Sequence, residues 1–292
     1  MLIESPIWPA QLDHFKINAP DPALIVDFYC KAIGYDAYPL DSGNILLQGQ
    51  QRRVVIGKGH AHSRPYHGFR LQDRRQLEEV RAFVKAQGIN SIENPSPLFN
   101  DDAVAVVDPD GWVSVFGLNR LDLPSPKASN NSPPMSMAAR LQHIVVATNN
   151  LDEMISFYEK TLAFSPSDYV LKDVNDKSSK QVAFWRTDEE HHSFAAFGAS
   201  SNRHDHHAYE TTGWMAMRDW ADHFGNLNIP IWWGPGRHGA GNNLFFMIED
   251  PLGDKIEISA EIERISRSTG PRWWDGTDGK AVNLWGAGWA RD

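Results

Sequence analysis

The sequence contains a single cysteine, Cys30, among 292 residues. One cysteine excludes an internal disulfide and fits a chain that works in a reducing compartment. No apolar run approaches the roughly 20 residues that a membrane-spanning helix needs. The first residues also lack the basic-then-apolar layout of a signal peptide. We therefore expect a cytoplasmic protein that has no membrane partner.

Basic residues are scarce relative to acidic ones. Lys and Arg number 28 against 37 Asp and Glu, which gives a formal net charge of −9. Because phosphate backbones are bound by basic surfaces, this balance argues against nucleic acid as a partner. The Gly-rich segment at residues 234–241, which we expect to be a loop, has neither the Lys nor the helix start of a phosphate-binding loop. A nucleotide site of that type is therefore excluded.

Histidine and tryptophan, in contrast, are abundant, with 12 and 11 residues. The composition is that of a globular protein, and the length allows two domains, each with its own core. Residues 121–137 are rich in Pro, Ser and Asn without any periodicity, which is typical of a linker. We predict an N-terminal domain at residues 1–120, this linker, and a C-terminal domain at residues 138–292 that ends in a Trp-rich tail.

The sequence pattern before the linker starts again after it. Residues 12–19 parallel residues 141–148, which aligns His14 with His143. Two later matches align His67 with His207 and Val115 with Glu257. Strand-like segments outnumber helical ones in both halves. We predict an α+β fold of two duplicated domains, each made of paired βαβββ modules curled round a cavity.

Hydrophobic periodicity and turn residues locate the main elements. The expected strands include residues 11–18, 104–107, 112–117, 244–248 and 255–259. One helix is expected to begin at Asp21-Pro22, because Asp caps helices and Pro suits the first turn. A second, amphipathic helix is expected at residues 74–87.

Glu257 lies in mid-strand, and His143 and His207 lie near the starts of strand-like runs. Two imidazoles and one carboxylate form the facial triad of non-haem Fe(II) oxygenases, which leaves positions open for substrate and O2. The alternative is three unrelated residues with structural roles. Side chains alternate along a strand, so His206 competes with His207 for the ligand position. Because Val115 replaces Glu257 in the first half, the metal-binding catalytic domain is the second.

Five segments in this order carry a resemblance to a known family: LQHIVV…FYEKTLAF, EEHHSFAAF, HDHHAYETTGW, GPGRHGAGNN and DPLGDKIEIS. In that order the sequence resembles the type I extradiol ring-cleavage dioxygenases of the vicinal oxygen chelate superfamily, such as the 2,3-dihydroxybiphenyl and homoprotocatechuate dioxygenases. The resemblance implies Fe(II), with Mn(II) as the less common ion, bound by His143, His207 and Glu257. It implies an aromatic diol and O2 as substrates, and we also expect a homo-oligomer.

The resemblance also assigns two catalytic histidines. His192 matches the family's acid–base histidine near bound O2, and His238 matches the histidine close to the substrate oxygens. Imidazole titrates near neutral pH and can therefore accept a proton from the diol. We predict that two other histidines, His191 and His204, are solvated.

One position departs from the family pattern. Ten residues before Glu257, where family members usually have a tyrosine, this sequence has Met247. A thioether cannot donate the hydrogen bond of a phenol, so the substrate pocket is expected to be more apolar and to suit a bulky aromatic diol or a different ring substrate. Trp185, in an alternating strand before His192, is predicted to contact the substrate.

Two alternative functions compete with ring cleavage. The first is a metal-dependent isomerase or lyase of the same superfamily, although such enzymes tend to assemble their ligands from two modules. The second is a non-catalytic protein that binds aromatic ligands, which would have no need of His192 and His238. The self-sufficient ligand set in the second half favours the dioxygenase.

Overall fold

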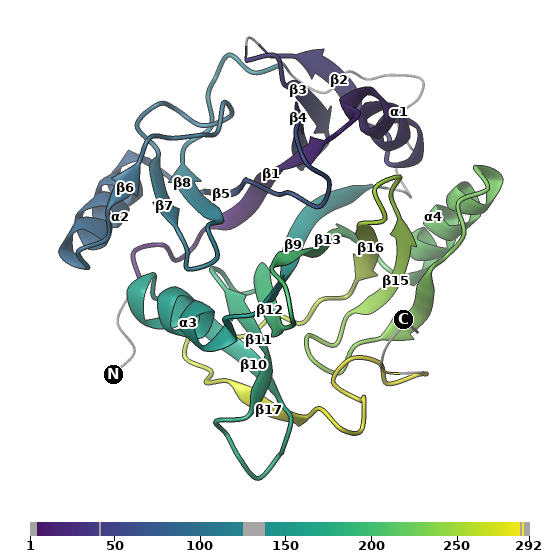
Figure 1. Cartoon of the computed structure of the whole chain (residues 1–292). Coiled ribbons are helices and arrows are strands. Elements are labelled where there is room, and N and C mark those ends of the chain that lie inside the picture. The colour runs from purple at the N-terminus through teal and green to yellow at the C-terminus, as the bar shows by residue number, and fades with distance from the viewer. Residues whose placement is uncertain (1–4, 41, 125–137, 287, 289–292) are drawn as a thin grey trace.

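The computed structural model describes residues 5–40, 42–124, 138–286 and 288. Its strands form two sheets, one in each half of the chain, with few helices (Figure 1). This mixed α+β architecture confirms the predicted fold class. Most of the predicted linker at residues 121–137 lies outside the described residues, and the division into domains of residues 1–120 and 138–292 stays a prediction.

The sheet of the first half has eight strands in the order β2-β3-β4-β1-β5-β8-β7-β6. The strands are β1 Gln11–Ala19, β2 Asp36–Pro39, β3 Ile45–Gly49, β4 Arg52–Lys58, β5 Tyr66–Arg70, β6 Ser91–Ile92, β7 Val104–Val107 and β8 Val113–Gly117, and the helices are α1 Pro22–Ala32 and α2 Arg74–Ala86. Both helices and strands β1, β7 and β8 agree closely with the predicted bounds.

The sheet of the second half has nine strands in the order β14-β15-β16-β13-β9-β12-β11-β10-β17. The strands are β9 Ala139–Thr148, β10 Ser165–Leu171, β11 Lys180–Arg186, β12 Phe194–Gly198, β13 Arg203–Thr211, β14 Trp233–Arg237, β15 Leu244–Glu249, β16 Lys255–Ala260 and β17 Arg272–Asp275. The helices are α3 Leu151–Ile155, which continues as a π-helical turn at Ser156–Thr161, and α4 Trp214–Asn226. The tail packs on its own half, because β17 pairs with β10.

Side-chain caps explain why the helices begin where they do. Asp21 accepts a hydrogen bond from the Ala23 N–H at 3.1 Å, and Pro22 occupies the first turn of α1. Asp73 accepts one from the Gln76 N–H at 2.8 Å at the start of α2. These contacts satisfy backbone donors that have no partner within the helix.

The Gly-rich segment at residues 234–241 is only partly a loop. Its first residues belong to β14, which pairs with β15 and places Gly236 opposite Phe245. A Cβ atom at position 236 would lie 2.6 Å from the Phe245 ring, so only glycine lets the strand approach this closely. The prediction of a loop for the whole segment is therefore wrong.

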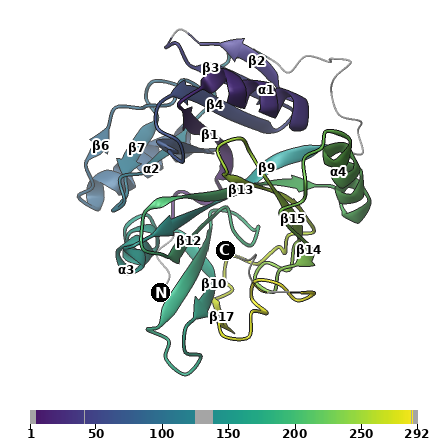
Figure 2. The same ribbon diagram turned by 45° about the vertical axis from the view of Figure 1, so that its right-hand side comes forward.

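The two halves meet through β1 and β9, which contact each other (Figure 2). One hydrophobic core contains residues from both sheets. Two tyrosines cross this boundary. The Tyr29 hydroxyl donates to Asp250 Oδ2 at 3.3 Å, and the Tyr158 hydroxyl donates to Asp108 Oδ2 at 2.9 Å. Each half thus places a helical tyrosine on the aspartate of the other half's last hairpin turn.

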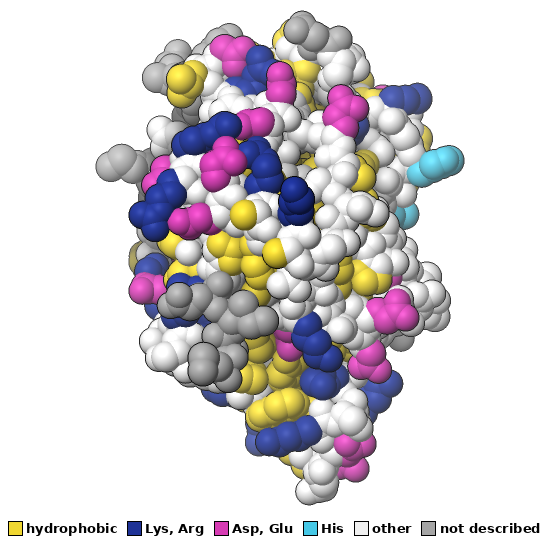
Figure 3. Space-filling view, turned by 90° about the vertical axis from the view of Figure 1, so that its left-hand side faces the viewer, with side chains coloured by type: hydrophobic (Ala, Val, Ile, Leu, Met, Phe, Trp, Pro, Cys, Tyr) yellow, Lys and Arg dark blue, Asp and Glu magenta, His cyan; other side chains and the backbone are white. Residues whose placement is uncertain are grey.

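Charges of both signs are mixed on the surface that Figure 3 shows, where Lys and Arg side chains lie beside Asp and Glu side chains. Helix α2 carries pairs of this kind, with Arg74 3.0 Å from Glu78 and Arg75 2.8 Å from Glu79. Within the described residues, every helix is too short or too polar to span a membrane.

Candidate metal and substrate site

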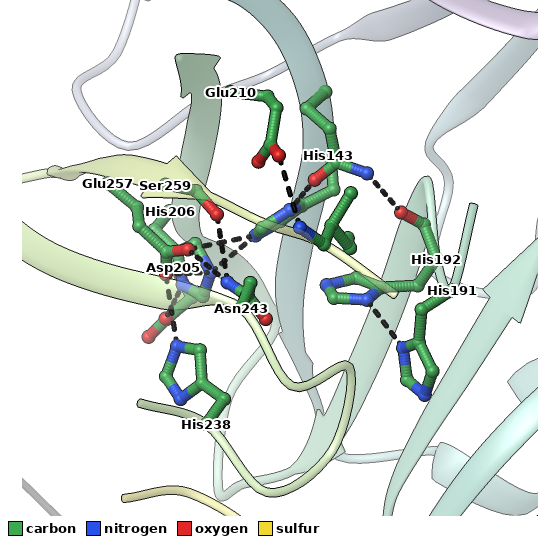
Figure 4. A network of polar contacts seen from close by, with 12 residues as sticks. His143, His191, His192, Asp205, His206, Glu210, His238, Asn243, Glu257 and Ser259 are labelled. Carbon is green, nitrogen blue, oxygen red and sulfur yellow. Dashed lines mark hydrogen bonds and ion pairs between the residues drawn. The ribbon is translucent and has the colours of Figure 1, made fainter. Parts of the chain in front are cut away.

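Three candidate ligands from neighbouring strands meet in the second half: His143 on β9, His206 on β13 and Glu257 on β16 (Figure 4). Their ligand atoms lie within 4.8 Å of one another, and the two Nε2 atoms of the histidines are 3.3 Å apart. The Glu257 carboxylate lies 3.9 Å from His143 Nε2 and 3.8 Å from His206 Nε2. Two imidazole nitrogens and one carboxylate oxygen converging on one point suit a divalent transition-metal ion.

The sheet register explains why these side chains share a face. Strand β13 lies between β9 and β16, and Ala208 pairs with both His143 and Glu257. His206 precedes Ala208 by two residues, so its side chain points to the same side of the sheet. One face of three adjacent strands therefore carries the whole donor set.

The prediction of His207 as a metal ligand is wrong. Its side chain points to the opposite face, where its ring centroid lies 4.6 Å from that of Phe15 and its Nε2 lies 3.3 Å from the Tyr29 hydroxyl. The repeat aligned His207 with His67, and both histidines face the boundary between the halves, where the His67 ring stacks on Phe194 with the centroids 5.0 Å apart. A shift of one residue along a strand reverses the side-chain direction, and His206 takes the position.

The second ring nitrogen of each histidine in the cluster is held by a neighbour in the sequence. His143 Nδ1 contacts Gln142 Oε1, and His206 Nδ1 lies 2.7 Å from Asp205 Oδ2. Both partners are acceptors, so each Nδ1 carries a proton and each Nε2 offers its lone pair to the cluster. Partners of this kind orient the imidazoles of metal sites.

Burial and charge set the protonation of the cluster. Burial, together with the neighbouring imidazoles, lowers the pKa of His143 well below its ordinary value, so its ring is neutral. Burial also acts to lower the pKa of His206, but the hydrogen bond and charge of Asp205 and the charge of Glu257 raise it above the ordinary value. A metal ion that binds here must displace any proton on His206, so affinity falls as the pH is lowered.

Both histidines predicted to be catalytic lie beside the cluster, on different sides of it (Figure 4). His192 is buried, and its ring centroid lies 4.3 Å from that of His143. His238 Nε2 lies 3.4 Å from Glu257 Oε2. The His238 Nδ1 donates to the Val282 carbonyl, and its ring stacks on Phe245 with the centroids 3.8 Å apart.

The cluster opens onto a cavity of about 520 Å³. This volume lies within the range of about 300–1,000 Å³ that is typical of small-molecule sites. The three cluster residues, His192 and His238 line it. The remaining lining residues are mostly apolar: Val145, Val170, Val182, Phe184, Phe197, Trp232, Trp233, Ala240, Met247, Ala281 and Val282, with Arg203, Asp205, Glu249 and Lys255 as the charged members.

Met247 lines this cavity, as its pairing with Glu257 across β15 and β16 requires. Trp185 does not, and its prediction as a substrate contact is wrong. Side chains alternate along β11, so Phe184 faces the cavity and Trp185 faces the core, where its Nε1 donates to Glu159 at 2.9 Å.

His191 and His204 were predicted to be solvated, and both predictions are wrong. The loop that carries His191 folds back onto the sheet, with its N–H donating to the Glu263 carbonyl at 2.8 Å. The His191 side chain is fully buried, and its Nε2 lies 3.0 Å from Asp168 Oδ2. His204 is also buried, with its Nε2 3.4 Å from His207 Nδ1.

The equivalent place in the first half is filled by side chains. Val115 packs in a small apolar cluster with Tyr66, Phe99 and Ala105. His14 turns its Nε2 toward Ser96 Oγ at 2.6 Å. The described residues of this half bring no carboxylate to the position of Glu257.

Some cavity residues escaped the sequence analysis for identifiable reasons. Trp233 pairs with Met247, but this pairing belongs to β14, which the sequence presented as a glycine-rich loop. Lys255 could have been found, because it precedes Glu257 by two residues and therefore lies on the same face.

Residues 140–258 match the family model described as the Glyoxalase/Bleomycin resistance protein/Dioxygenase superfamily. The match lies within the second half of the chain. The matched segment runs from β9 to β16 and so contains His143, His206 and Glu257.

The proteins that this chain resembles match both of its halves. Metapyrocatechase 2 of Cupriavidus necator is 23% identical over 273 residues, which cover 87% of this chain and 82% of that protein. The structure of homoprotocatechuate 2,3-dioxygenase from Arthrobacter globiformis has a TM-score of 0.80 at 22% identity, covering 97% of this chain and 89% of that one. The Mn(II)-bound glyoxalase from Novosphingobium aromaticivorans has a TM-score of 0.75 at 21% identity, covering 95% and 91%. The named relatives confirm the resemblance to extradiol dioxygenases, and the structural likenesses show the shared fold.

Proposed function

We propose that the protein is an extradiol dioxygenase that opens a catechol-type aromatic diol with O2 at one metal ion held by His143, His206 and Glu257. The observation that carries this proposal is the convergence of the three side chains at the wall of a cavity that contains two further imidazoles. Relatives named metapyrocatechase 2 and 3-methylcatechol 2,3-dioxygenase support the reaction class. We propose Fe(II) as the native ion, with Mn(II) as the alternative.

The residues of the cluster fit such an ion. Both imidazoles present an Nε2 lone pair, and Asn243 donates to Glu257 Oε1 at 3.1 Å, which holds the carboxylate in place. Three protein ligands leave open positions, and the bound ion would supply the redox and Lewis-acid chemistry that couples a diol to O2.

The two remaining histidines handle the protons of the diol. Burial, reinforced by neighbouring imidazoles, lowers the pKa of His192 well below its ordinary value, so its ring is neutral and can accept a proton from a hydroxyl group. The His238 Nδ1 donates to the Val282 carbonyl, and its Nε2 lies at the cavity, 3.4 Å from Glu257 Oε2. When Glu257 is bound to an ion, this Nε2 can accept a hydrogen bond from a substrate hydroxyl, which fixes the orientation of the ring.

The cavity favours an apolar and bulky diol. Phe184, Trp232 and Trp233 supply aromatic walls, and Met247 adds a thioether instead of a phenol. Lys255 is engaged with Glu249 at 3.2 Å and lies over the Trp232 ring at 4.7 Å, so its charge is already paired. We propose that diols with an apolar ring substituent bind better than diols with a carboxylate.

The test is reconstitution with Fe(II) under anaerobic conditions, followed by a diol and then O2. We expect a yellow ring-opened product and one O2 consumed per diol, with 2,3-dihydroxybiphenyl and 3-methylcatechol preferred over 3,4-dihydroxyphenylacetate. No O2 uptake with any diol of the panel, in protein that has bound Fe(II), would refute the proposal.

The same preparation separates the alternatives. An isomerase or lyase would turn over without consuming O2, and a binding protein would take up the diol without product. The homo-oligomeric state and the cytoplasmic location stay predictions.

A further inference from the structure

A buried chain of polar contacts runs behind His192, away from the metal cluster. His192 Nδ1 lies 2.9 Å from His191 Nδ1, and His191 Nε2 lies 3.0 Å from Asp168 Oδ2. His191 and Asp168 have no exposed surface, and His192 is 3% exposed. This chain connects the proposed acid–base histidine to a carboxylate that the reaction itself does not use.

The Asp168 carboxylate is held as an anion. Arg272 donates to it from Nε at 2.7 Å and from Nη2 at 3.1 Å, and Trp274 Nε1 donates at 2.8 Å. Burial alone would raise the pKa of Asp168, but His191 and Arg272 lower it below the ordinary value. An ionised carboxylate can only accept hydrogen bonds.

This anion determines where the protons of both imidazoles lie. The Asp168 carboxylate lies 3.0 Å from His191 Nε2 and favours a proton on that nitrogen by its charge, although the angle at Nε2 is too bent for a hydrogen bond. A neutral His191 then has a lone pair on Nδ1. Because its neighbour at 2.9 Å is His192 Nδ1, the proton of that contact belongs to His192.

We infer that Asp168 and His191 are positioning residues that hold the His192 imidazole in the Nδ1–H tautomer, with the Nε2 lone pair turned toward the cavity. Figure 4 shows the second nitrogen of His192 on the side of its ring that faces the cluster. The same logic applies to the Ser-His-Asp triad, in which a carboxylate fixes the tautomer of the histidine. The tautomer does not depend on the metal, whereas its effect on turnover rests on the proposed function.

The surroundings hold His191 in this orientation. Gly241 approaches its ring so closely that a Cβ atom there would lie 3.1 Å from His191 Nδ1. Gly241 has a φ of +86°, a conformation that favours glycine. Ser167 Oγ donates to the His191 carbonyl, which fixes the backbone as well.

Three substitutions test the chain of polar contacts that runs from Asp168 through His191 to His192. Asp168→Leu removes the carboxylate, so that charge no longer favours a proton on His191 Nε2 and His192 populates both tautomers. His191→Leu removes the acceptor of the His192 proton. His191→Gln keeps the order of donors and acceptors, because the carbonyl oxygen of the glutamine can accept from His192 while its NH2 group donates to Asp168. Glu263→Gln is the matched control, since Glu263 pairs with Arg272 at 2.7 Å but lies outside the chain.

The direct measurement is the ¹⁵N NMR spectrum of histidine-labelled, metal-free protein, with the His192 signals identified by their loss in His192→Phe. The wild type, His191→Gln and Glu263→Gln should show a protonated Nδ1 and a bare Nε2 at His192. Asp168→Leu and His191→Leu should each show a mixture of the two tautomers. A wild-type His192 protonated on Nε2, or a pure Nδ1–H tautomer in Asp168→Leu, would overturn the inference.

Kinetics provides the second measurement. In Fe(II)-loaded protein, Asp168→Leu should lower kcat by up to about 10²-fold, because a His192 that populates both tautomers loses part of its general acid–base catalysis, with little change in KM. His191→Gln should restore most of the loss seen in His191→Leu. Failure of the proposed function is distinguishable, because a wild type that cleaves no diol would still show the Nδ1–H tautomer.

Discussion

Met247 determines which polar contacts a diol can make on one wall of the site. It is buried in the cavity lining opposite Glu257, where a phenol would reach the substrate oxygens but a thioether cannot. Methionine in place of the usual tyrosine therefore changes the chemistry of the pocket, because this wall offers no hydroxyl donor.

Met247→Tyr should add one hydrogen-bond donor to this wall. A hydrogen bond contributes about 1 kcal/mol net, which corresponds to about a fivefold lower KM for catechol. The added ring should weaken the binding of the bulkier diol 2,3-dihydroxybiphenyl, because it takes volume from the cavity. Steady-state kinetics with both diols tests this, and Met247→Leu is the matched variant without a hydroxyl. The same selectivity in Met247→Leu and Met247→Tyr would contradict the assigned role of the phenol.

The errors at single residues share one physical cause. His207, Trp185 and their cavity-facing neighbours differ only in which side of a strand they occupy, and a shift of one residue reverses that side. The sequence contained both histidines, but the face of β13 became clear only from its register with β9 and β16. His191 and His204 were expected to be solvated because their neighbours in the sequence are charged or polar. His191 lies in a loop that packs onto the sheet, and His204 lies in strand β13 with its side chain buried.

At the scale of elements, the sequence predicted those with a clear local pattern. The cap at Asp21, the amphipathic pattern of residues 74–87 and the alternation at residues 255–259 located both helices of the first half and the strand of Glu257. Strand β14 was missed because its glycines are typical of loops, whereas here they allow close approach to β15. Pairing between distant segments, such as β10 with the tail strand β17, has no local signal.

Strand β11 offers a matched pair of neighbours that tests its alternation. Phe184→Ala should weaken the binding of a bulky diol such as 2,3-dihydroxybiphenyl, with KM raised about tenfold, because it removes an aromatic wall, and should leave metal binding intact. Trp185→Ala should instead lower the free energy of unfolding by about 3–5 kcal/mol, because it leaves a cavity in the core. Urea unfolding and diol kinetics on both variants separate the two effects. A KM change that is larger for Trp185→Ala than for Phe184→Ala would contradict the observed register.

At the scale of the whole molecule, the two duplicated halves pack against each other, and ionisable groups are buried at the boundary between them. Asp108 is 5% exposed and accepts hydrogen bonds from the Tyr158 hydroxyl and from the backbone N–H groups of Asp110 and Trp112. Burial nevertheless raises its pKa from 3.8 to about 7. The folded state therefore keeps a proton on Asp108 at pH values where the unfolded chain has lost it.

This shift predicts a pH-dependent stability. Between pH 4 and about pH 7 the unfolded chain binds fewer protons at this group, so wild-type stability falls as the pH rises through that window. Asp108→Asn removes the effect, and its stability relative to wild type should increase over the same window by up to about 4 kcal/mol. Urea unfolding of the metal-free proteins at pH 4.5, 6 and 8 measures it. A difference that stays constant, or that decreases with pH, would contradict the assignment.

The two duplicated halves differ in the side chains that they place at the equivalent position. In the first half, Val115 and Tyr66 fill the place of the ligands, and in the second half Glu257 and His206 form the cluster. The first half thus provides a packed partner surface and the second half provides the chemistry.

The metal content of His206→Ala and His207→Ala tests the central claim most directly. After anaerobic reconstitution with Fe(II) and removal of loosely bound ions, His207→Ala should retain about one iron per chain, although the loss of packing should cost about 2–5 kcal/mol of stability. His206→Ala should lose iron and ring cleavage, since removing a ligand weakens metal binding by more than the about 10–100-fold caused by loss of an outer partner. Iron retained in His206→Ala and lost in a folded His207→Ala would contradict the account.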